Sequence, residues 1–355
     1  MSPSTSGAPS GHGHPGGQWY PREWPERIRA LAAGELTPVT PRLAATVPLL
    51  RDGPHGPSVH LLRRRTSMAF AAGAYAFPGG SVDPRDELGG EQGGAAGEES
   101  GDGPDGELRG RRPDFGAHWA GPPPAAWAER FGTGEATARA VVCAAVRETF
   151  EESGVLLAGP DARTVVADTT GDDWERDREA LVAHELSFAD LLRRRQLVLR
   201  SDLLGGWARW ITPEFESRRY DTWFFVAALP PGQRTRNAST EAESTVWLRP
   251  EEAVAGYDDG ELLMMPPTIA TLRQLCGYGS AAEVLEASAA RDLSPVLARA
   301  TLDGDEVVLS WPGHDEFTRR VAGSVPGDGG RAGTAAGTAD ETADGPQDDR
   351  EDERT

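Results

Sequence analysis

One segment constrains the fold of this chain more than any other, because residues 142–154 read as a helix with two chemically opposite faces. At about 3.6 residues per turn, apolar and charged side chains separate onto different arcs of the helical wheel. The apolar arc holds Val142, Ala145, Val146, Thr149 and Phe150, and the charged arc holds Arg147, Glu148, Glu151 and Glu152. One face should therefore pack into a core while the other gathers three carboxylates.

The three carboxylates lie at spacings i, i+3 and i+4, where like charges on a helix repel by about 0.2–0.5 kcal/mol per pair. A divalent cation would remove this repulsion, and Mg²⁺ and Mn²⁺ prefer hard oxygen ligands of this kind. An acidic helix face is more often simply solvated, because charged side chains are mostly exposed. The helix alone leaves both interpretations open.

The residues around this helix resemble the signature of the Nudix hydrolases, G-x5-E-x7-R-E-U-x-E-E-x-G-U, in which U is aliphatic. Residues 145–152, together with Gly154, follow the second half of the signature. Thr149 departs from it, since it occupies an aliphatic position. Upstream, residues 77–80 read Phe-Pro-Gly-Gly and supply the glycine of the first half.

The two halves of the signature are far apart, with about sixty residues between Gly80 and Arg147. Counting back eight residues from Arg147 leads to Arg139, so the first glutamate is expected to be missing. A split signature of this kind resembles the branch that contains the peroxisomal coenzyme A diphosphatases of the Nudix motif 19 type. The resemblance covers roughly residues 40–275. It implies an α/β (α+β) fold, the Nudix-type α/β/α sandwich with a mixed β-sheet.

The resemblance implies a site that binds Mg²⁺ or Mn²⁺ through Glu148, Glu151 and Glu152. Arg147 would orient one of these carboxylates, with Glu151 at i+4 as a possible partner, unless the two form an ordinary surface ion pair. The backbone at Gly79 and Gly80 would approach the metal or the substrate phosphate, because glycine has no Cβ in the way. The catalytic residues implied in this helix are Glu148, Glu152 and Arg147.

Further candidate residues lie in loops. In related enzymes a carboxylate ahead of a late strand joins the metals or acts as the base, and here Glu243 is preferred over Glu241. Arg218 and Arg219 could bind a phosphate bidentately, as could Arg64 within the run of three arginines at 63–65. For the loop acids and the arginines alike, plain solvation is the alternative.

The expected activity is metal-dependent hydrolysis of a diphosphate bond in a nucleoside diphosphate linked to another moiety. Coenzyme A or an acyl-CoA is the first candidate, and NADH, ADP-ribose or a nucleotide sugar is an alternative. A second possibility is a non-catalytic nucleotide-binding or sensing module, suggested by the missing glutamate and the long insert. A third is an interaction protein that acts through its acidic segments.

The expected organisation is a disordered leader (1–18), a Nudix domain (19–320) with an acidic Gly-rich insert at about 83–132 and a helical insertion at about 172–200, and a disordered acidic tail (321–355). Residues 83–114 hold ten acids against four arginines, and residues 322–355 hold nine against three. These two segments carry twelve of the twenty net negative charges. Segments so charged and so poor in apolar residues bury too little surface to fold.

Charge and composition also limit the partners. A net charge of −20 disfavours nucleic-acid binding, which needs basic groups to neutralise phosphates. All 36 basic residues are arginine, which excludes a P-loop lysine, a Schiff-base lysine and a lysine base. Cys143 and Cys276 give neither a metal spacing nor a disulfide framework, and no apolar run is long enough for a membrane helix. We expect a cytoplasmic protein with a small-molecule nucleotide substrate and leave the oligomeric state open.

Local patterns predict the main elements. Residues 41–52 and 57–66 read as two strands of a hairpin, and strands are also expected near 75–77, 207–211, 222–229 and 245–248. The acidic helix should have Thr133 as its N-cap and end at Gly154. Helices are expected in a peripheral insertion at 174–197, from Pro250, and across 266–300.

Overall fold

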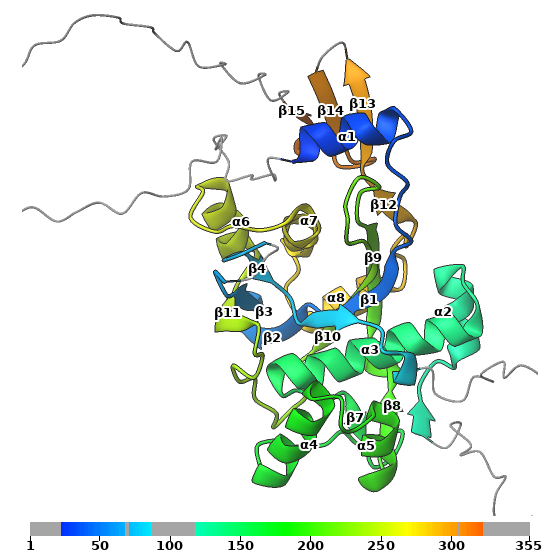
Figure 1. Cartoon of the computed structure of the whole chain (residues 1–355). Helices are drawn as coiled ribbons and strands as arrows, with labels where there is room; N and C mark the ends of the chain where they lie inside the picture. Colours follow the sequence, from blue (N-terminus) through cyan, green and yellow to red (C-terminus); the bar gives the residue numbers. More distant parts are fainter. Residues whose placement is uncertain (1–22, 68–70, 87–117, 304–305, 322–355) are drawn as a thin grey trace, which may run out of the picture. The chain divides into compact units, whose positions relative to one another are not determined.

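A mixed nine-stranded sheet with helices on both faces forms the centre of the domain (Figure 1). The computed structural model describes residues 23–67, 71–86, 118–303 and 306–321. The predicted leader, residues 87–117 of the predicted insert, and the tail from residue 322 lie outside the described residues. The α/β/α arrangement expected from the sequence is confirmed.

The elements have the following bounds. The helices are α1 Trp24–Ala32, α2 Pro124–Phe131, α3 Glu135–Ser153, α4 Asp172–Val182, α5 Phe188–Arg194, α6 Pro250–Asp258, α7 Pro266–Leu275 and α8 Ala281–Ser288. The main sheet contains β1 Arg42–Thr46, β2 Leu49–Gly53, β3 Gly56–Arg64, β4 Tyr75–Ala76, β5 Gly79–Ser81, β9 Gly205–Ile211, β10 Tyr220–Ala228, β11 Ala242–Leu248 and β12 Pro295–Leu297. Two three-stranded sheets contain β6 Trp119–Ala120, β7 Ala158–Gly159 and β8 Val198–Arg200, and β13 Arg299–Asp303, β14 Glu306–Ser310 and β15 Arg319–Val321.

Strand β10 is central to the sheet, parallel to β1 and β2 and antiparallel to β9. Successive side chains of a strand point to opposite faces. Trp223 and Phe225 therefore pack into the core that contains α3, while Phe224 and Val226 pack into the core that contains α6 and α7. Two cores on one strand explain why this segment is apolar without alternation.

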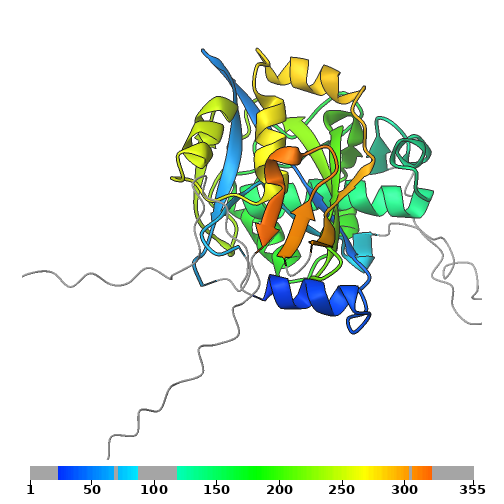
Figure 2. The ribbon, with the colours of Figure 1, turned by 90° about the horizontal axis from the view of Figure 1, so that it is seen from above.

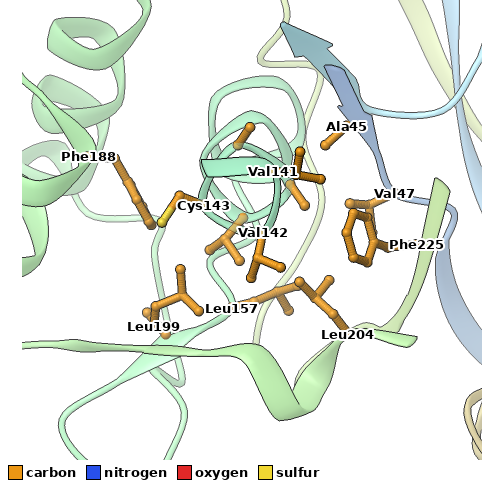
Figure 3. Close-up of a cluster of buried hydrophobic side chains, with 14 of the residues drawn as sticks. Ala45, Val47, Val141, Val142, Cys143, Leu157, Phe188, Leu199, Leu204 and Phe225 are labelled. Atoms are coloured by element: carbon orange, nitrogen blue, oxygen red, sulfur yellow. The ribbon is translucent and has the colours of Figure 1, made fainter. Parts of the chain in front are cut away.

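Helix α3 is enclosed by its neighbours, as Figure 3 shows for Val141, Val142 and Cys143. Cys143, which follows Val142 on this helix, is completely buried. The helix ends at Gly154, which has a positive φ of 74° as a C-terminal cap requires. The predicted N-cap was wrong by one residue, since Gly134 takes that position and not Thr133.

Four segments differ from expectation. Residues 41–52, expected as one strand, form β1 and β2, and only β2 pairs with β3. Residues 118–132, the end of the predicted acidic insert, form β6 and α2. The insertion with α4 and α5 is not peripheral, because Phe188 and Leu191 belong to the core around α3. The stretch 266–300 contains α7 and α8 but then forms β12, which pairs in parallel with β9.

The first described helix lies beside the three-stranded sheet formed by β13, β14 and β15. Figure 1 and Figure 2 both show α1 next to β13, and the two elements are in contact. Trp24 of α1 packs edge-on against Phe215, with ring centroids 5.2 Å apart. In the described part of the chain, no helix is long and apolar enough to cross a membrane.

The packing of α2 gives a stability prediction. The Phe131 ring lies 4.2 Å from that of Trp223 and 5.8 Å from that of Phe225, centroid to centroid. We expect Phe131→Ala to lower the free energy of unfolding by about 3–5 kcal/mol, because it leaves a cavity between α2 and the sheet. Glu129→Ala, an exposed change on the same helix, should stay within about 0.5 kcal/mol. Denaturant unfolding measures both; similar values for the two would show that α2 is not part of the core.

Candidate functional site

Arg147 of α3 is the centre of an ionic cluster that is almost closed to solvent. The residue is 5% exposed, and its guanidinium contacts three carboxylates. Nη1 donates to Glu148 at 2.9 Å and to Glu151 at 3.1 Å, and Nε donates to Asp86 at 3.0 Å. Nη2 donates to the carbonyl of Ser81 at 2.8 Å. The predicted contact between Arg147 and Glu151 is present, and it is buried, not a surface ion pair.

Asp86 is the residue that the sequence analysis missed. It lies at the end of the short 3-10 helix η1, Pro84–Asp86, and is 1% exposed. Counted forward from Gly80, the signature G-x5-E reaches residue 86, so an aspartate occupies the place of the first glutamate. Counting backward from Arg147 had led across the insert to Arg139, which pairs with Glu135 at 3.1 Å. The acid is therefore present, and the insert follows it.

The two glycines of β5 lie directly against the carboxylates of α3. The N–H of Gly79 donates to Glu152 at 2.8 Å. A Cβ on Gly80 would lie 2.4 Å from Oε1 of Glu148, and a Cβ on Gly79 would lie 2.5 Å from the carbonyl oxygen of Ala45. The glycine backbone therefore lies close to the helix carboxylates, and its expected approach to a metal or phosphate stays a prediction.

Burial raises the pKa values of the carboxyl groups in and beside this cluster. It raises the pKa of Glu148 to about 8, although Arg147 acts in the opposite direction. It raises the pKa of Glu152 to about 7, against the hydrogen bonds from Gly79 and Ser239. The pKa values of Glu151 and Asp86 are also raised, again mainly by burial. The helix face is therefore not the solvated surface that the sequence alone had left open.

The donor set suits a hard divalent cation. Within the described ranges, no three His, Cys, Asp or Glu side chains already converge as ligands of one ion. Mg²⁺ commonly takes only one or two protein carboxylates, together with water and substrate phosphate. Glu148 and Glu152 meet this need, since both carboxylates lie directly against β5. Glu151 contacts Arg147, and its expected part in the metal site stays a prediction.

The loop before β11 reaches the same cluster. Ser239, a second residue not anticipated, donates from its hydroxyl to Glu152 at 3.0 Å. The charge of Glu241 raises the pKa of Glu152, and the charge of Arg64 lowers it. Arg64 and Glu241 form an ion pair 3.4 Å long. The expected role of Arg64 in binding phosphate stays a prediction.

Glu243 pairs with Arg63 at 3.8 Å, at a bulge of β11 opposite β3. Arg63 and Arg64 are successive residues of β3, so their side chains point to opposite faces. Glu243 pairs with Arg63 and Glu241 pairs with Arg64, so we expect the two loop acids to lie on opposite faces. The role expected of Glu243 stays a prediction, with Glu241 as the alternative.

Arg218 and Arg219 lie away from the carboxylates. Arg218 and Arg219 immediately precede Tyr220, which pairs with Arg42 at the start of β1. Gly79, beside the carboxylates, pairs with Thr46 at the end of β1. Residues 42 and 46 of a strand are about 13 Å apart. Arg219 is buried and donates to the carbonyls of Thr212 and Val39, at 3.0 and 2.8 Å. These two hydrogen bonds hold the Arg219 side chain in the fold, and Arg218 is exposed beside it. The phosphate-binding role expected of both arginines stays a prediction.

Comparisons with known proteins agree with this geometry. A family model described as the NUDT19 Nudix domain matches residues 30–275. The acyl-coenzyme A diphosphatase NUDT19 of Xenopus laevis is 28% identical over 288 residues, 73% of this chain and 71% of that protein. The protein of the same name from Gallus gallus is 29% identical over 208 residues, 50% of this chain and 53% of that one. A Nudix hydrolase structure from Alicyclobacillus acidocaldarius has a TM-score of 0.55 at 24% identity and covers 72% of this chain and 99% of its own.

The contact at Gly80 gives the second prediction. We expect Gly80→Ala to displace the Glu148 carboxylate and weaken Mn²⁺ binding by about 10–100-fold, as changes that misorient a metal ligand do. Gly134→Ala is the matched control, because nothing lies within 4 Å of its added Cβ. Isothermal titration with Mn²⁺ measures both. Equal affinities in the two variants would contradict the role of Gly80.

Proposed function

This chain belongs to the Nudix hydrolases, and we propose that it hydrolyses the diphosphate bond of a nucleoside diphosphate linked to another moiety. The observation that carries the proposal is the assembled signature: Arg147 joins Asp86 of the first half to Glu148 and Glu151 of the second. The first substrate candidates are coenzyme A and acyl-CoA. They are supported by the Xenopus and chicken relatives, whose names state acyl-coenzyme A diphosphatase.

The proposed chemistry is addition of water across the P–O–P bond. With coenzyme A, the products would be 3′,5′-ADP and 4′-phosphopantetheine. Glu148 and Glu152 would hold Mg²⁺ or Mn²⁺, which supplies charge neutralisation for the phosphate oxygens and lowers the pKa of water. Gly79 and Ser239 keep Glu152 in one orientation by donating to its two oxygens.

Arg64 and Glu241 would complete the site. Within the described part of the chain, Arg64 forms one ion pair, the 3.4 Å contact with Glu241. A guanidinium has five N–H donors, so Arg64 could still donate to a substrate phosphate. Glu241 has a side chain that is 56% exposed, so water can reach its carboxylate. We propose Glu241 as the base that accepts a proton from the attacking water. The cytoplasmic location, expected from two unpaired cysteines, stays a prediction.

A matched pair of variants separates the two loop acids. We expect Glu241→Gln to lower kcat by about 100-fold or more, because a positioned base contributes about that much. Glu243→Gln should leave kcat nearly unchanged, since Glu243 pairs with Arg63 and not with Arg64. Initial rates at saturating substrate measure both. A large loss in Glu243→Gln alone would restore the original assignment.

A substrate panel tests the function itself. We expect coenzyme A or an acyl-CoA to be hydrolysed faster than NADH, ADP-ribose or a nucleotide sugar, and only with Mg²⁺ or Mn²⁺ present. Glu152→Gln should lower kcat/KM by at least about 100-fold, because it removes a charge from the cation site. Product analysis by chromatography gives the rates and the bond cleaved. Tight nucleotide binding by calorimetry without turnover on any substrate would favour a binding module instead.

A further inference from the structure

Arg178 of α4 contacts two separate parts of the site at once. Its Nη1 donates to the carbonyl of Glu151 at 2.9 Å and to the carbonyl of Ala238 at 3.1 Å. The residue is 6% exposed, although α4 belongs to the insertion that the sequence suggested was peripheral. A buried guanidinium that bridges two backbone carbonyls fixes the separation between them.

Both carbonyls belong to segments that hold Glu152. Glu151 lies in the last turn of α3, where carbonyls lack partners within the helix and a positive group is favourable. Ala238 immediately precedes Ser239, whose hydroxyl donates to Glu152 at 3.0 Å. The same hydroxyl oxygen accepts from the N–H of Glu241 at 3.2 Å. The bridge therefore ties the end of α3 to the loop that orients Glu152.

Glu175 keeps the Arg178 side chain in place. It accepts from Nε of Arg178 at 3.1 Å and pairs with Arg236 at 3.1 Å. The backbone N–H of Arg236 donates to the carbonyl of Ser153 at 3.0 Å, again at the end of α3. The Glu175 carboxylate of α4 thus contacts both Arg178 and Arg236, and through them α4 contacts the end of α3 and the loop before β11.

Building on the proposed function, we propose that Arg178 is a positioning residue for the cation site. It sets the distance between the end of α3 and the loop 238–241, and so the orientation of Glu152 and Glu241. A helix of the insertion thereby determines how well the carboxylates of α3 bind a divalent cation.

The test compares Arg178→Met and Arg178→Lys with Arg176→Met, an exposed change on the same helix. Mn²⁺ affinity by isothermal titration is the first readout, and kcat and KM are the second. We expect Arg178→Met to raise the Kd for Mn²⁺ by about 10–100-fold and to lower kcat more than it changes KM. Arg178→Lys should fall between wild type and Arg178→Met, because an ammonium keeps the charge without the planar fork.

A double variant separates positioning from general stabilisation. If Arg178 acts through the loop, Ser239→Ala added to Arg178→Met should cause little further loss of Mn²⁺ affinity. Fully additive effects, or a lower Tm with unchanged Mn²⁺ affinity, would overturn the proposal. If wild type binds Mn²⁺ but hydrolyses no diphosphate, the proposed function fails while the affinities still decide the role of Arg178. A wild-type chain that binds no Mn²⁺ would overturn both.

Discussion

Arg147 holds one positive charge in contact with three carboxylates, those of Asp86, Glu148 and Glu151, where almost no solvent reaches. An isolated buried charge would cost several kcal/mol, so each member of this cluster requires the others. The cluster also joins distant parts of the chain, because Asp86 precedes the long insert and Arg147 follows it. The two halves of the signature therefore act as one unit in space despite their separation in sequence.

The same cluster has more negative charge than its arginine can balance. Glu152 is held by two neutral donors, Gly79 and Ser239, and its pKa rises with burial to about 7. A fold selected only for stability would not bury such a group without a cationic partner. The imbalance is what a site for a divalent cation and a polyphosphate requires. The sheet on one side and α4 on the other give it a rigid support.

Much of this was predictable because it depends on local patterns. The arcs of α3, its end at Gly154 and the hairpin of β2 and β3 follow from periodicity and glycine placement. Asp86 was missed because the count began on the wrong side of the insert; the spacing from Gly80 would have found it. The choice between Glu241 and Glu243 depends on a bulge in β11, which local sequence does not reveal. The hydrogen bonds from Arg219 to the carbonyls of Thr212 and Val39 were not predictable, because nothing in the local sequence brings these three residues together.

The central claim is that the buried carboxylates of α3 form a cation site beside β5. Anomalous diffraction at the manganese edge, from crystals grown with Mn²⁺, tests it most directly. We expect an anomalous peak within bonding distance of Glu148 and Glu152, next to Gly79 and Gly80, and we expect it to disappear in Glu152→Gln crystals. Peaks only at other acidic residues, or none in crystals that retain wild-type packing at saturating Mn²⁺, would contradict it.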